Sequence, residues 1–443
     1  MQSAPSGKLA LSPLFLFLCL FLGTGFYFQS QGVDYAFYQL PAPAALLPAI
    51  LLAFWLSRES LGNTIDQFVT GAGHSNIITM CLIYLLAGAF SAVAKASGGV
   101  DATVVIGLQL VPSQFILPGL FLIAAFIATA MGTSMGTLAA LAPIAAGVAD
   151  AAGISPALMA GVLVSGAIFG DNLSIISDTT IAATRTQGCD MKDKFKANLL
   201  LALPAAVLVL VLLFVIGHPA ELETADTANP VLMLPYLLIL ILAIVGVNVF
   251  SVLVIGIVSS ALLGILVGDY QMMAIGKDIY AGFGQMQEVF ILSLLLGGLS
   301  ELMRRQGGLR FLVTRISRLI QSSSLTPKLG YSLGIAALIS CVNACVANNT
   351  VAIIVAGDTV KELAEAGDIE PKKAASLIDI FACVLQGILP YGAQLLLLGA
   401  SFSVSPVEII PYAFYCYWLA LVTLGSFVWQ YFLQRKVGQA GVE

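Results

Sequence analysis

Long apolar segments recur along the whole chain and are separated by short polar stretches. Two examples are residues 202–216 and 232–250. A helix needs about 20 mainly apolar residues to cross a bilayer, whereas the strands of a membrane barrel alternate apolar and polar positions over about ten residues. The pattern therefore predicts an all-α polytopic membrane protein, with the lipid bilayer as its surroundings.

The composition supports this class and excludes several others. Of the 443 residues, 59% are hydrophobic and only 10% are charged, and the mean hydropathy is +0.98. Soluble domains carry roughly 25% charged residues. The seven cysteines show no metal-ligand spacing. We find no phosphate loop, dinucleotide fingerprint or nucleophile elbow, so we expect no enzyme, no cofactor and no nucleic-acid partner.

Two remote parts of the chain repeat the same landmarks. Residues 61–100 and 275–309 each contain a polar lead-in, an apolar span with a central glycine and a Gly-Gly exit. The matched residues lie 209 to 215 positions apart, as in Gly73/Gly284, Gly88/Gly298, Gly98/Gly307, Thr137/Thr350 and Pro156/Pro371. The offsets predict a duplication with a first half at 10–217, a linker at 218–229 and a second half at 230–433.

The distribution of basic residues predicts that the two halves are inverted. Lysine and arginine cluster at 185–196, at 304–328 and at Arg435 and Lys436, whereas the linker 218–229 has neither. Basic loops stay in the cytoplasm, so the linker should be external and each half should cross the membrane an odd number of times. We expect a bacterial-type inner-membrane protein with both termini in the cytoplasm. The sequence leaves open whether it forms a homodimer.

Each half also has two apolar segments that polar residues interrupt. These segments are 115–150 and 157–185 in the first half, and 329–360 and 372–402 in the second. The link at 150–155 has no basic residue, whereas the link at 361–373 has three lysines. This difference favours a re-entrant hairpin followed by a broken spanning helix in each half, beside four uninterrupted spans. The alternative is that all four segments are ordinary spanning helix pairs.

The four interruptions contain the polar side chains that an ion could bind. Non-helical backbone at membrane depth is tolerated where it lines a cavity, and its freed carbonyls can coordinate ions. The candidate ligands are Thr133, Ser134 and Thr137; Asp171, Asn172, Ser174, Ser177, Asp178, Thr179 and Thr180; Asn343, Asn348, Asn349 and Thr350; and Gln386 and Gln394. Their hard oxygen atoms suit Na⁺ or a proton on a carboxylate.

The carboxylates divide into a predicted sodium ligand and predicted proton carriers. We expect Asp178, with Ser174, Ser177 and Thr179, to bind Na⁺, because it would begin a helix after an unwound stretch. Asp171 and Asp379 are the candidate proton sites, and Asp379 could also pair with a lysine. A carboxylate in a membrane interior is a functional hypothesis by default. The alternative is that Asp171 and Asp178 only cap helices.

The stretch "FGDNLSIISDTTIAA" resembles the NhaC-type Na⁺/H⁺ antiporters, whose pattern is close to F-G-D-K-x-S-P-x-S-D-T-T-N-x-A. "GTSMGT" and "GISPALMAGVLVSGAIFGD" resemble the same family. The resemblance implies a secondary active transporter that exchanges Na⁺ for protons by alternating access. Asn172, Ile175 and Ile181 depart from the family pattern within the presumed site. The alternatives are therefore Na⁺- or H⁺-coupled transport of an organic solute, such as an amino acid or dicarboxylate, and a passive channel.

Overall fold

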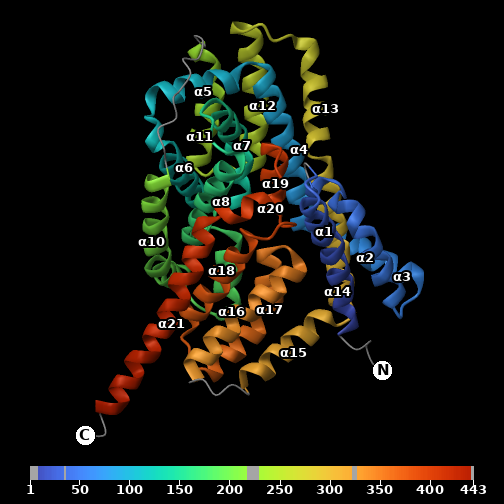
Figure 1. Ribbon diagram of the computed structural model, residues 1–443, viewed down its shortest axis with the longest axis vertical. Coiled ribbons are helices and arrows are strands. Elements are labelled where there is room, and N and C mark those ends of the chain that lie inside the picture. The colour runs from blue at the N-terminus through green and yellow to red at the C-terminus, as the bar shows by residue number, and fades with distance from the viewer. Residues whose placement is uncertain (1–7, 34–35, 217–228, 322–326, 441–443) are drawn as a thin grey trace.

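The computed structural model describes residues 8–33, 36–216, 229–321 and 327–440, and every regular element in these ranges is helical (Figure 1). Eight of the described helices are long and apolar enough to cross a membrane, or up to ten if each of two bent pairs forms one span. The predicted all-α polytopic class is confirmed. Apart from Asn229, the predicted linker lies outside the described residues.

The first half contains α1(Ser12–Ser30), α2(Ala42–Leu56), α3(Leu61–Ala72), α4(Ser75–Ala96), α5(Gly99–Leu110), α6(Ile116–Met131), α7(Ser134–Ala151), α8(Pro156–Leu173), α9(Asp178–Gln187) and α10(Met191–Ile216). The second half contains α11(Leu234–Ile244), α12(Val249–Val267), α13(Ile275–Gln285), α14(Gln287–Arg305), α15(Gly308–Gln321), α16(Pro327–Val346), α17(Asn349–Ala366), α18(Pro371–Gln386), α19(Ala393–Phe402), α20(Pro406–Ile409) and α21(Phe414–Ala440). Short 3₁₀ turns join several of them.

Left-handed backbone conformations recur at a fixed distance along the chain. Within the described ranges, ten residues have positive φ, and they form the pairs Gly32/Gly246, Gly98/Gly307, Gly132/Ala347, Gly153/Asp368 and Gly188/Ser403. The members of a pair lie 209 to 215 residues apart, in the same range as the landmarks of the sequence repeat. Three of the pairs contain a residue other than glycine. Since such residues adopt positive φ at an energetic cost, the surrounding structure imposes the turn at these three positions.

Contacts between the two halves are reciprocal. α3 packs against α14 and α4 packs against α13, while α9 packs against α17 and α7 against α19. At the first two contacts, Gly71 lies against Gly297 and Gly88 lies against Gly282, so that two backbones meet without side chains between them. In Figure 1, α13 and α14 run beside α4 and α3 on the right of the molecule.

The interrupted segments form the centre of the molecule and each contains a helix break. The breaks lie at Gly132–Thr133, at 174–177, at Ala347–Asn348 and at 387–392. Thr133 and Asn348 are extended and cap the helices that follow, and their side chains accept hydrogen bonds from the amides of Gly136 and Val351. Of the eight candidate spans among the described residues, α8 is the most buried, because 83% of its 18-residue apolar stretch lies inside the protein.

Candidate ion site

Three charged side chains are buried in the part of the chain that the structure describes. They are Asp171 on α8, Lys194 on α10 and Asp379 on α18, with exposed fractions of 4%, 0% and 0%. Burial of a charge is costly unless partners compensate for it. The partners of these three residues therefore define the candidate site.

Asp171 binds the beginning of α7. Its Oδ2 accepts hydrogen bonds from the Ser134 hydroxyl at 2.7 Å and from the Ser134 amide at 3.3 Å. Ser134 is the first residue of α7, and the positive end of a helix dipole stabilises a carboxylate there. The N-terminus of α7, directly after the break at Gly132, thus stabilises the buried Asp171 carboxylate.

A chain of amide hydrogen bonds connects this carboxylate to the second half. The Gln394 side chain donates to the Ser134 hydroxyl at 3.3 Å, and the Gln386 side chain donates to Gln394 Oε1 at 2.8 Å and to the Ala347 carbonyl at 3.4 Å. All four interruptions contribute to this network. Gln386 lies 215 residues after Asp171, which is within the range of spacings between the repeated landmarks. The position that matches Asp171 therefore carries a neutral side chain.

Lys194 and Asp379 form a buried ion pair next to the first network. Lys194 Nζ lies 2.8 Å from Asp379 Oδ2, and it donates to the Thr180 hydroxyl at 2.6 Å and to the Asn172 carbonyl at 3.3 Å. The Asn198 side chain donates to Asp379 Oδ2 and to the same Asn172 carbonyl, both at 2.8 Å. Asp379 thus pairs with a lysine, one of the roles that the sequence left open.

The two carboxylates are close enough to influence each other. Asp171 interacts electrostatically with both Asp379 and Lys194. Asn172, directly after Asp171, provides the carbonyl that Lys194 and Asn198 bind. The three buried charges therefore form one cluster with a formal net charge of −1 when all are ionised. The Asn172 side chain turns away toward Tyr415, with Nδ2 and the tyrosine hydroxyl 3.5 Å apart.

The structure does not bring the Asp178 side chain together with the hydroxyls of Ser174, Ser177 and Thr179. Ser177 is the N-cap of α9, and its hydroxyl bonds Thr179 and Thr180. Asp178 is exposed, and it forms no hydrogen bond or ion pair with any described residue. Because the inward face of α9 runs through residues 180 and 184, position 178 faces outward, as does Arg185. The hydroxyl of Ser174 instead accepts from the Ile176 amide, and the Ser174 carbonyl accepts from Thr180.

Several of the remaining predicted ligands lie near the breaks, and their side chains form hydrogen bonds with backbone groups. Thr137 donates to the Thr133 carbonyl, and the Asn343 side chain donates to the Ala382 carbonyl. Asn349 Oδ1 accepts from the Thr350 amide. Asn348 caps α17, so neither its side chain nor that of Asn349 bonds a first-half aspartate.

Lys194 and Asn198 are site residues that the sequence reading missed. Lys194 was counted among the cytoplasmic basic residues at 185–196, but the structure buries it, whereas Arg185, Lys192 and Lys196 are exposed. Lys194 and Asn198 are four residues apart on α10, on the same face. That spacing is the signal that could have placed both side chains on one face of the helix, although it does not name Asp379 as their partner. Among the described residues, no group of three or more His, Cys, Asp or Glu could hold a metal ion.

A polytopic helical protein with buried charges beside paired helix breaks has the construction of a secondary transporter. Residues 9–218 match the model of the Na⁺/H⁺ antiporter family. The Na⁺/H⁺ antiporter NhaC of Bacillus subtilis is 25% identical over 409 residues, which are 86% of this chain and 89% of the relative. The chain is therefore similar to NhaC-type Na⁺/H⁺ antiporters over most of its length, and the predicted resemblance is confirmed.

Two further relatives have other names. The arginine/ornithine antiporter ArcD of Halobacterium salinarum is 24% identical over 414 residues, which are 85% of this chain and 84% of the relative. A malate-2H⁺/Na⁺-lactate antiporter of Bacillus subtilis is 30% identical over 287 residues, which are 59% of each chain. The relatives are thus antiporters, and their named substrates include both ions and organic solutes.

Proposed function

We propose that this multi-pass membrane protein exchanges Na⁺ for protons by alternating access, with Asp171 as the carboxylate that binds either ion. The observation that carries the proposal is the buried cluster of Asp171, Lys194 and Asp379. Two carboxylates and one ammonium leave one negative charge uncompensated. In a medium of low dielectric, that charge favours the uptake of one monovalent cation.

The surroundings of Asp171 suit both ions in turn. The Ser134 hydroxyl donates to Asp171, and its oxygen can instead face a cation once the proton of the hydroxyl turns away. Gln394 adds an amide from the other half. A proton and a Na⁺ ion compete for the same carboxylate, so only one of them is bound at a time. This competition couples their movements.

Alternating access follows from the proposed inverted repeat of 10–217 and 230–433. The five pairs of positive-φ residues and the reciprocal packing of α3–α14 and α4–α13 support the duplication. In such folds the ion site lies between the repeats near the membrane midplane, and one part rocks against the other. We place the protein in a bacterial-type inner membrane with both termini in the cytoplasm.

The test is proton movement in liposomes that contain the purified protein and a pH-sensitive dye. Addition of Na⁺ outside should move protons in the opposite direction, whereas choline at equal ionic strength should not. Protein-free liposomes are the control. If the protein binds Na⁺ but Na⁺ drives no proton movement in this assay, the proposed exchange is refuted.

The second candidate is antiport or coupled transport of an organic solute. It is favoured by the names of two relatives and by Asn172, which stands where the NhaC-type pattern has lysine. The same liposomes should then be tested with arginine, ornithine, malate and lactate. If one of these moves protons or Na⁺ while Na⁺ alone moves no protons, the organic-solute function replaces the first.

A further inference from the structure

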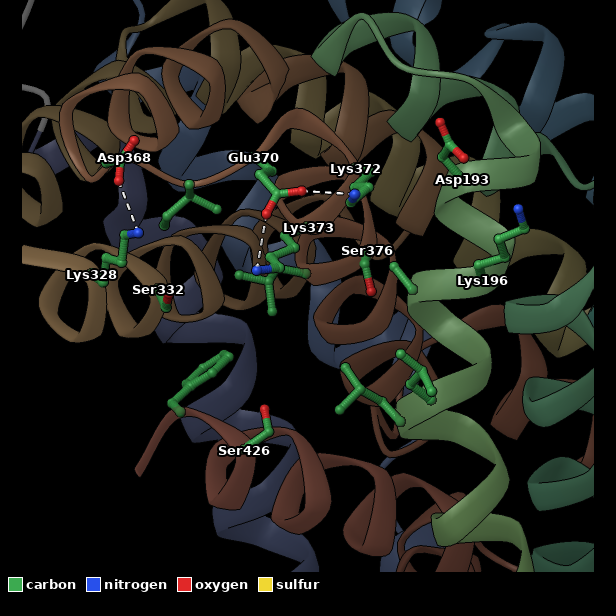
Figure 2. A pocket seen from close by; sticks show the side chains of 16 residues that line it. Asp193, Lys196, Lys328, Ser332, Asp368, Glu370, Lys372, Lys373, Ser376 and Ser426 are labelled. Carbon is green, nitrogen blue, oxygen red and sulfur yellow. Dashed lines mark ion pairs between the residues drawn. The ribbon is translucent and has the colours of Figure 1, made fainter. Parts of the chain in front are cut away.

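A cavity of about 660 Å³ opens between the beginnings of α10 and α18, beside α16 and α21 (Figure 2). Asp193 and Lys196 line it from α10, and Lys372, Lys373 and Ser376 line it from α18. On each helix the lining residues are three or four positions apart, so each helix lines the cavity with one face. The cavity therefore follows the two helices that also hold Lys194 and Asp379.

The outer part of the cavity is charged. Glu370 pairs with Lys372 at 2.8 Å and with Lys373 at 3.2 Å, and Lys328 pairs with Asp368 at 2.8 Å. Hydrogen bonds from Lys372 and Lys373 lower the pKa of the Glu370 carboxyl, so that it stays ionised. Figure 2 shows these pairs above and to the left of Ser376. Charged, exposed side chains of this kind keep water in the outer part of the cavity.

The inner part of the cavity ends at the buried hydroxyl of Ser376. Ser376 lines the cavity with an exposed fraction of 2%, and its hydroxyl has no hydrogen-bond partner among the described residues. Asp379 follows three positions later on the same helix face, about 4.5 Å further along the axis. Its Oδ1 is also buried and without a partner in the described chain.

A third oxygen of this kind comes from α10. Asn198 binds Asp379 Oδ2 through its amide nitrogen, and its Oδ1 has no partner within the described residues. Nearly all buried polar atoms in proteins are hydrogen-bonded, so an unpartnered carboxylate oxygen together with the unpartnered oxygens of Asn198 and Ser376 indicates a site for water or a cation. Carboxylate, amide and hydroxyl oxygens are the donors that a hard monovalent cation takes.

We propose that the cavity between α10 and α18 is a water-filled vestibule that leads to a second cation site formed by Asp379, Asn198 and Ser376. An ion that arrives there competes with the Lys194 ammonium for Asp379 and passes on toward Asp171. The choice of Na⁺ as the ion rests on the proposed function. The buried cluster still holds a single cation, because its net charge is the same whichever carboxylate the ion occupies.

The vestibule can be tested by thiol labelling of a Ser376→Cys variant in liposomes with a charged, membrane-impermeant reagent. Wild-type protein gives the background from native cysteines, of which Cys19 and Cys341 are exposed. Ser332→Cys, at the cavity wall, should react with or without Na⁺, and the fully buried Ser165→Cys should not react. Ser376→Cys should react with the reagent, because the reagent reaches it through the water in the vestibule. Na⁺ at ten times its dissociation constant should slow that reaction about tenfold relative to choline.

A second variant tests the ligands themselves. Replacement of the ion pair by neutral side chains, in Lys194→Met/Asp379→Asn/Ser376→Cys, leaves no unpaired charge at this position, so the variant is expected to fold. This variant should still react, but Na⁺ should no longer protect it. Protection that persists would overturn the assignment of Asp379.

The remaining outcomes separate this inference from the proposed function. If Ser332→Cys reacts and Ser376→Cys does not, the vestibule is refuted. If Ser376→Cys reacts equally in Na⁺ and choline, in liposomes whose wild-type protein exchanges Na⁺ for protons, the second site is refuted and the proposed function stands. Absence of exchange in wild-type liposomes would instead refute the proposed function.

Discussion

Asp171 and Asp178 lie seven residues apart but have opposite surroundings. Asp171 is buried and binds the first residue of α7, whereas Asp178 is exposed on the outward face of α9. Side-chain type and motif membership are the same for both residues, so burial and partners alone distinguish them. The proposed exchange depends on the buried carboxylate.

The first prediction compares these two aspartates. Asp171→Asn keeps the side-chain shape but removes the negative charge that attracts the cation, so Na⁺-driven proton movement should be lost. Asp178→Asn, the matched control, should retain the wild-type rate. The measurement is dye-reported proton movement at equal amounts of folded protein. Normal exchange by Asp171→Asn, together with its loss in Asp178→Asn, would restore the assignment made from the sequence.

Ser134 provides the second prediction. Ser134→Ala removes the hydroxyl that donates to Asp171 at 2.7 Å. A hydrogen bond to a charged group contributes about 1.5–3 kcal/mol, so the apparent Na⁺ affinity should change by about 10- to 100-fold. Ser260→Ala removes a buried hydroxyl on α12 that has no partner in the described chain, and it should leave the affinity unchanged. Equal affinities in both variants would place Ser134 outside the ion site.

The sequence identified Asp171 but not the whole cluster. The motif around Gly170 contains only local information, and it names Asp171 and Asp178 without showing which one faces inward. That direction depends on which residue caps α9, because a shift of one position turns a side chain by about 100° around the helix axis. Lys194 and Asp379 come from opposite halves of the chain, and no local pattern joins them. Their pairing is a consequence of the packing of α10 against α18.

Helix breaks at matched places are the main feature at the scale of elements. Gly132 and Ala347 both have left-handed backbone conformations directly before an extended capping residue. The sequence predicted the positions of these breaks because glycine and polar residues interrupt otherwise apolar segments. It did not predict that Ala347 would adopt a glycine-like conformation, since only the surrounding fold imposes it.

The third prediction concerns the break before α7. Gly153→Ala should destabilise the protein by about 1 kcal/mol, because φ is positive there but the added methyl group meets nothing. Gly132→Ala should destabilise it by about 2–4 kcal/mol, because the methyl group also meets Ile176 in the unwound stretch. Thermal unfolding in detergent measures both variants. A smaller effect at Gly132 would show that the break can adjust its position.

Over the whole molecule, left-handed turns recur at a spacing of 209 to 215 residues. Ala151 and Ala366 are exposed, lie 215 residues apart and are the last residues of α7 and α17. If the repeats are inverted, these two residues lie on opposite sides of the membrane. Sidedness thus tests the arrangement without any assay of transport.

The fourth prediction is that Ala151→Cys and Ala366→Cys react with an impermeant thiol reagent from opposite sides. Ala151→Cys should be labelled in intact cells and Ala366→Cys in inside-out vesicles, because the lysines near Ala366 belong in the cytoplasm. Wild-type protein gives the background of the native cysteines. Labelling of both variants from the same side would exclude inverted halves.

The buried cluster of Asp171, Lys194 and Asp379 has an electrical consequence. With one Na⁺ or one proton bound, the cluster is neutral, so the loaded protein would carry no net charge across the membrane. If an unbalanced elementary charge crossed the membrane instead, a potential of about 100 mV would change the free energy of that step by about 2.3 kcal/mol. We expect equal exchange rates in liposomes with a K⁺/valinomycin potential and in liposomes clamped at zero. A rate that follows the sign of the potential would contradict a single-cation cluster. An exchanger of this kind would equalise the Na⁺ and proton gradients and draw no work from the membrane voltage.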